Sequence, residues 1–184
     1  MRGKIRLANP SDAEAILKIY APYIEKTAIT FEYAVPSTED FSKRIENTLK
    51  KYPWLVYEED EKILGYAYGG PEYTREAYQW TVGTSVYISE EAKGKGIGSA
   101  LYEKILDILE KQNFCLCYAR INDDNEASIK MHEKFGFKTI GIRRNCGYKF
   151  EKWHGIIVME KQLNDFSVPP KDIIPIGKLD YEFL

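Results

Sequence analysis

The residues best suited to bind a ligand form the glycine-rich turn Gly94-Lys95-Gly96-Ile97-Gly98-Ser99, which follows Lys93. Glycine lets the backbone approach a ligand closely. Consecutive amides at the start of a helix, with the partial positive charge of its N-terminus, favour an anion, and Lys93 and Lys95 add full charges. The turn therefore predicts a pyrophosphate cradle. A turn that merely joins a strand to a helix would have the same composition.

The spacing of these glycines separates the known kinds of phosphate loop. A P-loop requires GxxxxGK followed by Ser or Thr, and the sequence has no such run. A dinucleotide fingerprint requires GxGxxG after an early strand, whereas this turn reads GxGxG and lies in the middle of the chain. The spacing therefore argues against nucleotide hydrolysis and against hydride transfer.

A second group of polar residues consists of Asn125, Ser128 and His132. Their separations of three and four place them on one face of a helix. Histidine can accept or donate a proton near neutral pH, so His132 is a candidate acid or base. It is equally consistent with a histidine that only packs, and Asn125 is also a natural helix N-cap. His154 is expected to be structural or on the surface.

Composition limits the classes of protein to which the chain can belong. The 184 residues fit one domain, the formal net charge of −2 argues against a nucleic-acid binder, and no apolar run is long enough to span a membrane. Cys115, Cys117 and Cys146 are an odd number without a CxxC pair, which predicts neither a disulfide framework nor a metal site. We therefore expect a cytoplasmic protein with no membrane and no nucleic-acid partner.

Hydrophobic periodicity predicts alternating strands and helices. Helices are expected after an N-cap at Ser11 with Glu14 as its capping box, from residue 37 or 38 to about 51, after the glycine turn, and from Asn125 to Phe135, where Gly136 suits a left-handed position. Strands are expected over residues 4–8, 54–57, 63–69, 78–88, 116–121, 138–142 and 153–160, with a turn over 58–61 and a break at 69–71. This order indicates an α/β fold whose sheet has antiparallel and parallel parts.

The C-terminal segment differs from the rest of the chain. Residues 1–163 are predicted to form one domain, and residues 164–184, with Pro169, Pro170 and Pro175, to form an irregular tail. Three isoleucines, Ile173, Ile174 and Ile176, suggest that this tail docks on the domain.

Several segments in a fixed order resemble a known family. They are Ser85-Val86-Tyr87-Ile88, the turn from Lys93 to Ala100, Asn125-Glu126-Ala127-Ser128-Ile129 and His132-Glu133-Lys134-Phe135-Gly136-Phe137. Together they resemble the GNAT superfamily of acetyl-CoA-dependent N-acetyltransferases. Thr30-Phe31-Glu32, Tyr52-Pro53-Trp54 and Trp80-Thr81-Val82 are similar to the phosphinothricin acetyltransferase branch. The resemblance spans about Ile5 to Leu163 and implies a mixed sheet with helices on both faces.

The resemblance also implies a mechanism. The pyrophosphate of coenzyme A would lie on the backbone of residues 93–99, with Asn125 and Ser128 nearby, and its pantetheine arm would pair with Val86, Tyr87 and Ile88. The backbone of Val86 and Tyr87 would stabilise the oxyanion. The amine would attack directly, so no cysteine nucleophile is needed, and His132 would act beside the coenzyme sulfur. The branch further implies a homodimer and no metal.

The acceptor side departs from the branch. Gly83 stands where the branch commonly has a glutamate proposed as general base, and Gln79 stands where it often has a basic residue. The proton of the amine must then go to water or to Glu32, Glu72 or Glu76, unless the amine has a low pKa. Predicted acceptor-binding residues are Phe31, Glu32, Arg75 and Tyr78; Arg75 suits a carboxylate but equally a solvated surface.

These departures argue against phosphinothricin itself as the native acceptor. The resemblance still implies acetyl transfer to the primary amine of a small acceptor, such as an amino acid or an analogue of the type of phosphinothricin or methionine sulfoximine. Two alternatives stay open. The acceptor is a protein N-terminus or lysine, or the chain is a non-catalytic acyl-CoA-binding module.

Overall fold

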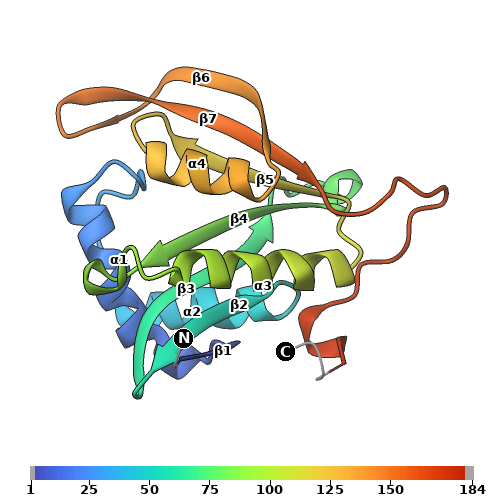
Figure 1. The fold of residues 1–184 in the computed structure, drawn as a ribbon, viewed down its shortest axis with the longest axis horizontal. Coiled ribbons are helices and arrows are strands. Elements are labelled where there is room, and N and C mark those ends of the chain that lie inside the picture. Colours follow the sequence, from blue (N-terminus) through green and yellow to red (C-terminus); the bar gives the residue numbers. More distant parts are fainter. Residues whose placement is uncertain (1–2, 181–184) are drawn as a thin grey trace.

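The computed structural model describes residues 3–180, which form a seven-stranded mixed sheet (Figure 1). The strand order is β1 (Lys4–Leu7), β2 (Trp54–Glu59), β3 (Lys62–Pro71), β4 (Thr81–Ile88), β5 (Leu116–Asn122), β7 (Lys152–Gln162) and β6 (Lys138–Lys149). All neighbours are antiparallel except β4 and β5, which are parallel. The predicted mixture of antiparallel and parallel pairing is confirmed.

Helices cover both faces of the sheet, as predicted. In Figure 1, α3 (Ile97–Lys111) and α4 (Glu126–Lys134) lie in front of it, and α1 (Ala13–Lys26) and α2 (Thr38–Leu49) lie behind. The buried side chains divide in the same way. One cluster lies under α3, with Leu101, Ile105 and Ile108 at its centre, and the other lies under α1 and α2, with Ile16 and Ile45. The apolar side chains of α3, the helix predicted after the glycine turn, therefore face the core.

The pairing of β4 with β5 is short, and this creates the opening that holds the site. Only Thr81, Val82 and Gly83 are paired with β5, opposite Leu116, Cys117 and Tyr118. Beyond Gly83 the two strands have no partner in each other. The rest of β4 therefore has one edge bonded to β3 and one open edge that faces β5.

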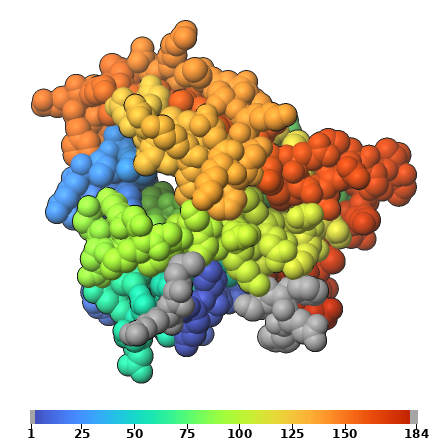
Figure 2. Space-filling model, in the orientation of Figure 1, coloured from blue at the N-terminus to red at the C-terminus, as the bar shows by residue number. Residues whose placement is uncertain are grey.

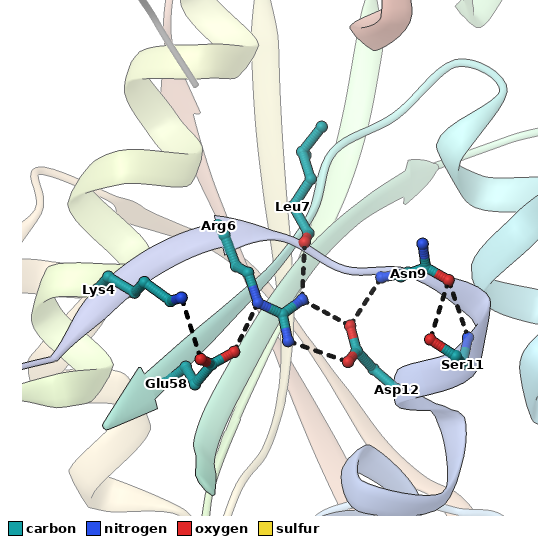
Figure 3. Close-up of polar contacts among 7 residues, drawn as sticks. All are labelled: Lys4, Arg6, Leu7, Asn9, Ser11, Asp12 and Glu58. Carbon is teal, nitrogen blue, oxygen red and sulfur yellow. Dashed lines mark hydrogen bonds and ion pairs between the residues drawn. The ribbon is translucent and has the colours of Figure 1, made fainter. Parts of the chain in front are cut away.

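Arg6 joins the first strand to the start of α1 (Figure 3). Its guanidinium contacts Glu58 Oε2 at 2.7 Å and both carboxylate oxygens of Asp12 at 2.7 and 3.0 Å. Asp12 also accepts the Asn9 N–H at 2.7 Å, and Asn9 accepts the Ser11 N–H. The capping box predicted at Ser11 is therefore wrong: Asn9 and Asp12 form it around the short 3-10 turn η1 (Pro10–Asp12), because Pro10 starts that turn.

Several predicted boundaries also need correction. The strand predicted from residue 78 begins at Thr81, because Glu76–Tyr78 form the 3-10 turn η2, in which Tyr78 N–H bonds the Arg75 carbonyl. The predicted break at 69–71 is wrong: β3 continues to Pro71, opposite Val82. The turn predicted over residues 58–61 is shorter in the structure. The β2–β3 hairpin turns at Asp60 and Glu61, which have positive φ.

The last two strands are longer than predicted, because they form one hairpin with its turn at Phe150 and Glu151. Gly136 has φ +85°, which confirms the predicted left-handed position after α4. β6 lies at the edge of the sheet and exposes Ile140 and Ile142. The homodimer stays a prediction.

The described part of the tail, residues 164–180, docks on the domain, as the isoleucines predict, and residues 181–184 lie outside the described residues. Ile176 is 1% exposed within the α3-side core, and Gln112 donates to the carbonyls of Ile174 and Lys51 at 2.7 Å each. Apart from the short turn η4 (Ile176–Lys178), residues 163–180 form no helix or strand. Between residues 3 and 180, every helix is too short or too polar to serve as a membrane span.

Candidate active site

A large groove of about 590 Å³ lies beside the glycine turn. Its wall combines the open edge of β4, the start of α3, the outer face of α4 and the end of α1, and includes Val86, Ile88, Gly94, Gly96, Ser99 and Ser128. Figure 2 shows the surface hollowed between these segments. We call this cavity the glycine-turn groove.

The glycine turn is shaped to leave its amides open. Gly94 and Gly96 have φ of +75° and +79°, and a Cβ at either position would meet nothing within 4 Å. Gly96 is the N-cap of α3, and no side chain caps that helix end. The first amides of α3 thus lack the usual cap partner and are available to an anion.

The other predicted members of the turn are placed differently. Lys93 lines the groove, is paired with Glu90 at 2.6 Å and lies over the Tyr23 ring at 5.7 Å. The side chain of Ile97 is buried in the core, so its backbone is what the turn can offer. Lys95 is exposed and is not part of the groove wall. The backbone rather than the lysines therefore dominates the groove.

The open edge of β4 presents alternate residues. The Ser89 N–H bonds the Leu64 carbonyl on β3, whereas both backbone polar groups of Ile88 meet the Tyr23 hydroxyl. Because backbone groups alternate sides along a strand, Val86 directs its N–H to the open edge and Tyr87 directs its own to β3. The edge thus offers the Val86 amide as the free donor, while Tyr87 packs its ring between Tyr20 and Tyr23.

A narrow slot of about 60 Å³ crosses the sheet where β4 and β5 separate. Residues 84–87 and 119–122 form its two sides, and Asn125, Ser128 and His132 reach it from α4. The slot and the glycine-turn groove share Val86, Asn125 and Ser128 in their walls, so the two spaces adjoin each other. A chain lying in the groove could pass its end into the slot.

His132 is buried at one end of this slot, 4% exposed. Its Nδ1 lies 2.7 Å from the Ser128 carbonyl oxygen, which can only accept, so Nδ1 carries the proton and Nε2 is the acceptor nitrogen. Burial lowers the pKa of His132, which keeps the ring neutral at pH 7. His132 also packs edge-on against Tyr102 and Phe137, so the packing role considered above is present, and the acid or base role stays a prediction.

Asn125 likewise has two roles. Its side chain caps α4 by accepting the Ser128 N–H at 3.2 Å, which confirms the predicted N-cap. It also lines both the groove and the slot. The α1–α2 loop is fixed next to it, because Asn122 donates to the Ala28 carbonyl at 3.0 Å and the buried Lys149 donates to the carbonyls of Thr27 and Thr30 at 2.8 Å.

A third cavity, of about 260 Å³, opens on the sheet face opposite α3 and α4. It is bounded by Tyr68, Gly70, Gly83, Ser85, Tyr118 and Arg120. It shares Thr84, Ser85 and Arg120 with the slot. Groove, slot and cavity therefore lie one after another across the sheet, and we call the third space the far-face cavity.

The predicted acceptor residues are spread over different places. Glu32 lines another cavity, under α2, and pairs with Arg44 at 2.7 Å. Phe31 packs beneath the β6–β7 hairpin, close to Gly147. Arg75 and Tyr78 are exposed around η2 and line none of the cavities described above. Their binding roles stay predictions.

Arg120 is the cationic residue that the sequence analysis missed. It borders both the slot and the far-face cavity, and its Nη2 lies 3.5 Å from Glu72 Oε2. The signal was present in the alternation of β5, because Cys117, Ala119 and Ile121 are buried and Arg120 falls between them on the opposite face.

Two further groups bear on the chemistry. Burial raises the pKa of Cys117 to about 12 and also raises that of Cys115, so both thiols stay protonated at neutral pH. Asp123, Asp124 and His154 bring ligand atoms within 4.8 Å of one another. Lys152 contacts Asp124 at 2.8 Å and the Gly155 N–H contacts Asp123, so protein donors already serve this cluster. The absence of a metal stays a prediction.

Known proteins provide a direct comparison. Residues 5–158 match the family model described as an acetyltransferase (GNAT) domain. The chain is 32% identical to phosphinothricin N-acetyltransferase of Streptomyces viridochromogenes over 96% of each chain. It is 31% identical to the L-methionine sulfoximine/L-methionine sulfone acetyltransferase of Salmonella typhimurium, over 90% of this chain and 97% of that one.

A solved structure agrees. The phosphinothricin acetyltransferase of the GNAT superfamily from Sinorhizobium meliloti, in complex with acetyl-CoA, superposes with a TM-score of 0.87 at 29% identity over 94% of each chain.

Proposed function

The chain belongs to the GNAT acetyltransferase family and is an acetyl-CoA-dependent N-acetyltransferase, and we propose that its acceptor is the primary amine of a small amino acid or amino-acid analogue. The observation that carries this proposal is that the glycine-turn groove, the slot and the far-face cavity adjoin in that order across the sheet. Donor and acceptor can enter from opposite faces of the sheet and meet where β4 and β5 separate.

The glycine-turn groove suits acetyl-CoA. The uncapped start of α3 and the left-handed Gly94 and Gly96 can receive the pyrophosphate, and the open edge of β4 can pair with the pantetheine arm. In the slot, the Val86 amide would donate to the oxyanion that forms when the amine attacks the thioester carbonyl.

The far-face cavity suits an acceptor that carries a carboxylate. Arg120 is the cation on its wall, and a guanidinium binds a carboxylate through two parallel hydrogen bonds. Methionine sulfoximine and phosphinothricin, on which the relatives named above act, both carry an amino-acid carboxylate next to the amine. We infer that Arg120 holds this carboxylate and thereby directs the amine toward the slot.

The transfer is proposed to be direct. Cys115 and Cys117 are buried with raised pKa values, so neither supplies a thiolate for an acyl-enzyme. His132, neutral with Nε2 as acceptor, takes a proton from the nitrogen of the tetrahedral intermediate. It then returns this proton to the sulfur of coenzyme A as the C–S bond breaks.

The test is thiol release from acetyl-CoA with a panel of acceptors: L-amino acids, methionine sulfoximine, phosphinothricin, polyamines and short peptides. Turnover with the amino acids or analogues, and loss of turnover when the acceptor carboxylate is amidated, is expected. Turnover confined to peptides would favour a protein N-acetyltransferase. Silence across the panel with acetyl-CoA bound by calorimetry would favour a non-catalytic binding module.

A further inference from the structure

The space beside Gly83 is occupied by a carboxylate from another part of the chain. A Cβ built on Gly83 would lie 3.2 Å from Glu72 Oε2. Gly83 is opposite Gly70 in the β3–β4 pairing, and a Cβ at Gly70 would meet nothing within 4 Å. Two facing glycines therefore leave a notch in the sheet. Glu72, directly after the last residue of β3, folds into the part of it beside Gly83.

Glu72 is buried without being satisfied. The residue is 7% exposed, and its Oε2 accepts no hydrogen bond from any described residue. Arg120 Nη2 lies 3.5 Å away, but its side chain is 46% exposed and also borders the far-face cavity. A buried carboxylate oxygen without a donor carries a free-energy cost, which a purely structural residue would avoid.

From this placement we propose, on the basis of the function proposed above, that Glu72 is the general base that removes the proton from the acceptor's ammonium group. It does so in the position that a side chain at residue 83 would otherwise fill. The base comes from the end of β3 instead of from β4, and it reaches the same notch from the neighbouring strand.

The proton balance of the reaction has a place for such a base. The acceptor arrives as R–NH3+, and one proton passes to the Glu72 carboxylate, which leaves a lone pair on nitrogen. That lone pair forms the N–C bond to the thioester carbonyl. The intermediate loses its second proton to His132, and this proton goes to the sulfur as the C–S bond breaks. Glu72 then releases its proton to water at the exposed side of Arg120.

The separation along β4 suits this role. Gly83 precedes Val86 by three residues, which corresponds to about 10 Å of strand. The amine of the acceptor and one bridging water fill that distance, and a base that acts through one water is effective. The acceptor amine would thus lie between Glu72 and the slot, with its carboxylate on Arg120.

The electrostatic surroundings agree with a base. Burial raises the pKa of Glu72, and the positive charges of Arg120 and Arg143 oppose that rise. The negative charge of Glu72 also contributes to raising the pKa values of Tyr118 and Cys117. Both have raised pKa values themselves and stay neutral near pH 7. A carboxylate with a raised pKa accepts a proton more readily than an ordinary one, which favours a general base.

The experiment relocates the carboxylate. Four proteins are compared with the best acceptor of the panel: wild type, Glu72→Gln, Glu72→Ala, and the double variant Glu72→Ala with Gly83→Glu. Alanine at position 72 removes the Oε2 atom that a Cβ at position 83 would crowd, so the new glutamate has room. We expect kcat to fall about 100-fold or more in both single variants. The double variant should recover at least tenfold over Glu72→Ala. Acetyl-CoA affinity by calorimetry should stay within about twofold throughout.

The pH profile adds a readout that packing would not move. The acidic limb of kcat/KM should lie above the range of an ordinary carboxyl group in wild type, disappear in Glu72→Gln and return in the double variant. Glu103→Gln, which removes the same charge from the exposed face of α3, should behave as wild type.

The outcomes separate the two proposals. No turnover by wild type with any amine counts against the proposed function. Turnover by wild type with an unchanged kcat and pH profile in Glu72→Gln overturns the base role alone. So does a loss that follows Glu32→Gln or Glu76→Gln instead. A folded double variant that binds acetyl-CoA but shows no gain over Glu72→Ala also overturns it and assigns Glu72 to packing beside Arg120.

Discussion

The two faces of the sheet offer different kinds of group to a ligand. On the α3 and α4 face, the site uses backbone groups from short continuous stretches, at the glycine turn and along β4. On the opposite face, it uses the side chains of Glu72 and Arg120, which are 48 positions apart (120 − 72) and meet only in the folded sheet. The first face depends on conformation and the second on side-chain chemistry.

This difference determines which groups of the site can be supplied from another position in the chain when the sequence changes. An amide donor stays in place as long as the turn keeps its glycines, so the donor side is tied to a recognisable motif. A carboxylate needs only to reach the same point in space. We infer that this is why Gly83 is tolerated: the notch between Gly70 and Gly83 admits Glu72 from the adjacent strand.

Among the changes that test ligand binding, the largest effect is expected on the backbone-based side, from Gly96→Val. A left-handed φ costs an ordinary residue about 1–2 kcal/mol, and a branched side chain at this position would project into the groove. Acetyl-CoA affinity should fall roughly 100-fold, or about 2.7 kcal/mol. Calorimetry would measure it.

Gly141→Val is the matched control, because a Cβ there also meets nothing within 4 Å but the backbone has no positive φ. It should bind acetyl-CoA as wild type does. Equal affinity in the two variants would remove the phosphate cradle from the glycine turn.

The next effect is on the side-chain-based face, from Arg120→Ala. Loss of a charge-assisted bond to a carboxylate costs about 1.5–3 kcal/mol, so the acceptor KM should rise roughly 10- to 100-fold with acetyl-CoA affinity unchanged. The acidic limb should also move to higher pH, because the Arg120 charge lowers the pKa of Glu72. Arg120→Lys should restore the pH of the acidic limb more fully than it restores the acceptor KM. Lysine keeps the positive charge but lacks the two parallel hydrogen-bond donors of the guanidinium.

Initial rates over acceptor concentration and pH would measure both. A KM rise in Arg75→Ala with none in Arg120→Ala would instead place the acceptor carboxylate at η2, as the sequence analysis allows.

His132 lies between the two faces, and its effect should be smaller. A thiolate leaves readily because thiols have pKa values near 8.5, so water can complete the protonation slowly. We expect His132→Gln to lower kcat about tenfold while acetyl-CoA affinity and acceptor KM hold. Single-turnover kinetics would locate the loss in the chemical step. An unchanged kcat at every pH would leave His132 with the packing role that its contacts with Tyr102 and Phe137 already give it.

The same contrast explains what the sequence could reveal. The glycine turn and the spacing of Asn125, Ser128 and His132 are local patterns, and the structure brings them to one groove and one slot. The prediction of a capping box at Ser11 failed because Pro10 starts a separate turn that Asn9 and Asp12 cap. The prediction that a strand starts at residue 78 failed because aromatic content alone does not distinguish the turn at Glu76–Tyr78 from a strand.

The Glu72–Arg120 pair could not be predicted as a pair. It requires the β3–β4 register, which sets Gly70 against Gly83, and the short β4–β5 pairing, which brings β5 alongside. Alternation in β5 indicates the face of Arg120 but not the strand it meets. Glu72 was one of three candidate carboxylates, and only the burial of its side chain beside Gly83 distinguishes it from Glu32 and Glu76.

The smallest effect is on stability, and it distinguishes a functional carboxylate from a structural one by sign. Burial raises the pKa of Glu72 above its value in the unfolded chain, so the folded state holds that proton more tightly and ionised Glu72 destabilises it at pH 7. Glu72→Gln should therefore melt higher at pH 7, by about 2–4 °C for each kcal/mol. The gain should fade as pH drops through the raised pKa toward 4.5, the ordinary value.

Glu58 gives the opposite sign. Hydrogen bonds from Arg6 and Lys4 lower the pKa of Glu58, so its charge stabilises the fold above the unfolded pKa and that contribution is lost as pH falls through the lowered one. Glu58→Gln should melt lower at pH 7 and approach wild type in acid. Calorimetric melts of both variants from about pH 3 to 8 would test the pair, because the Glu58 contribution is lost below 4.5, the ordinary glutamate pKa. A Glu72→Gln protein that melts lower at pH 7 would mean that Arg120 holds this carboxylate for stability, and the two faces would then differ less than the site geometry indicates.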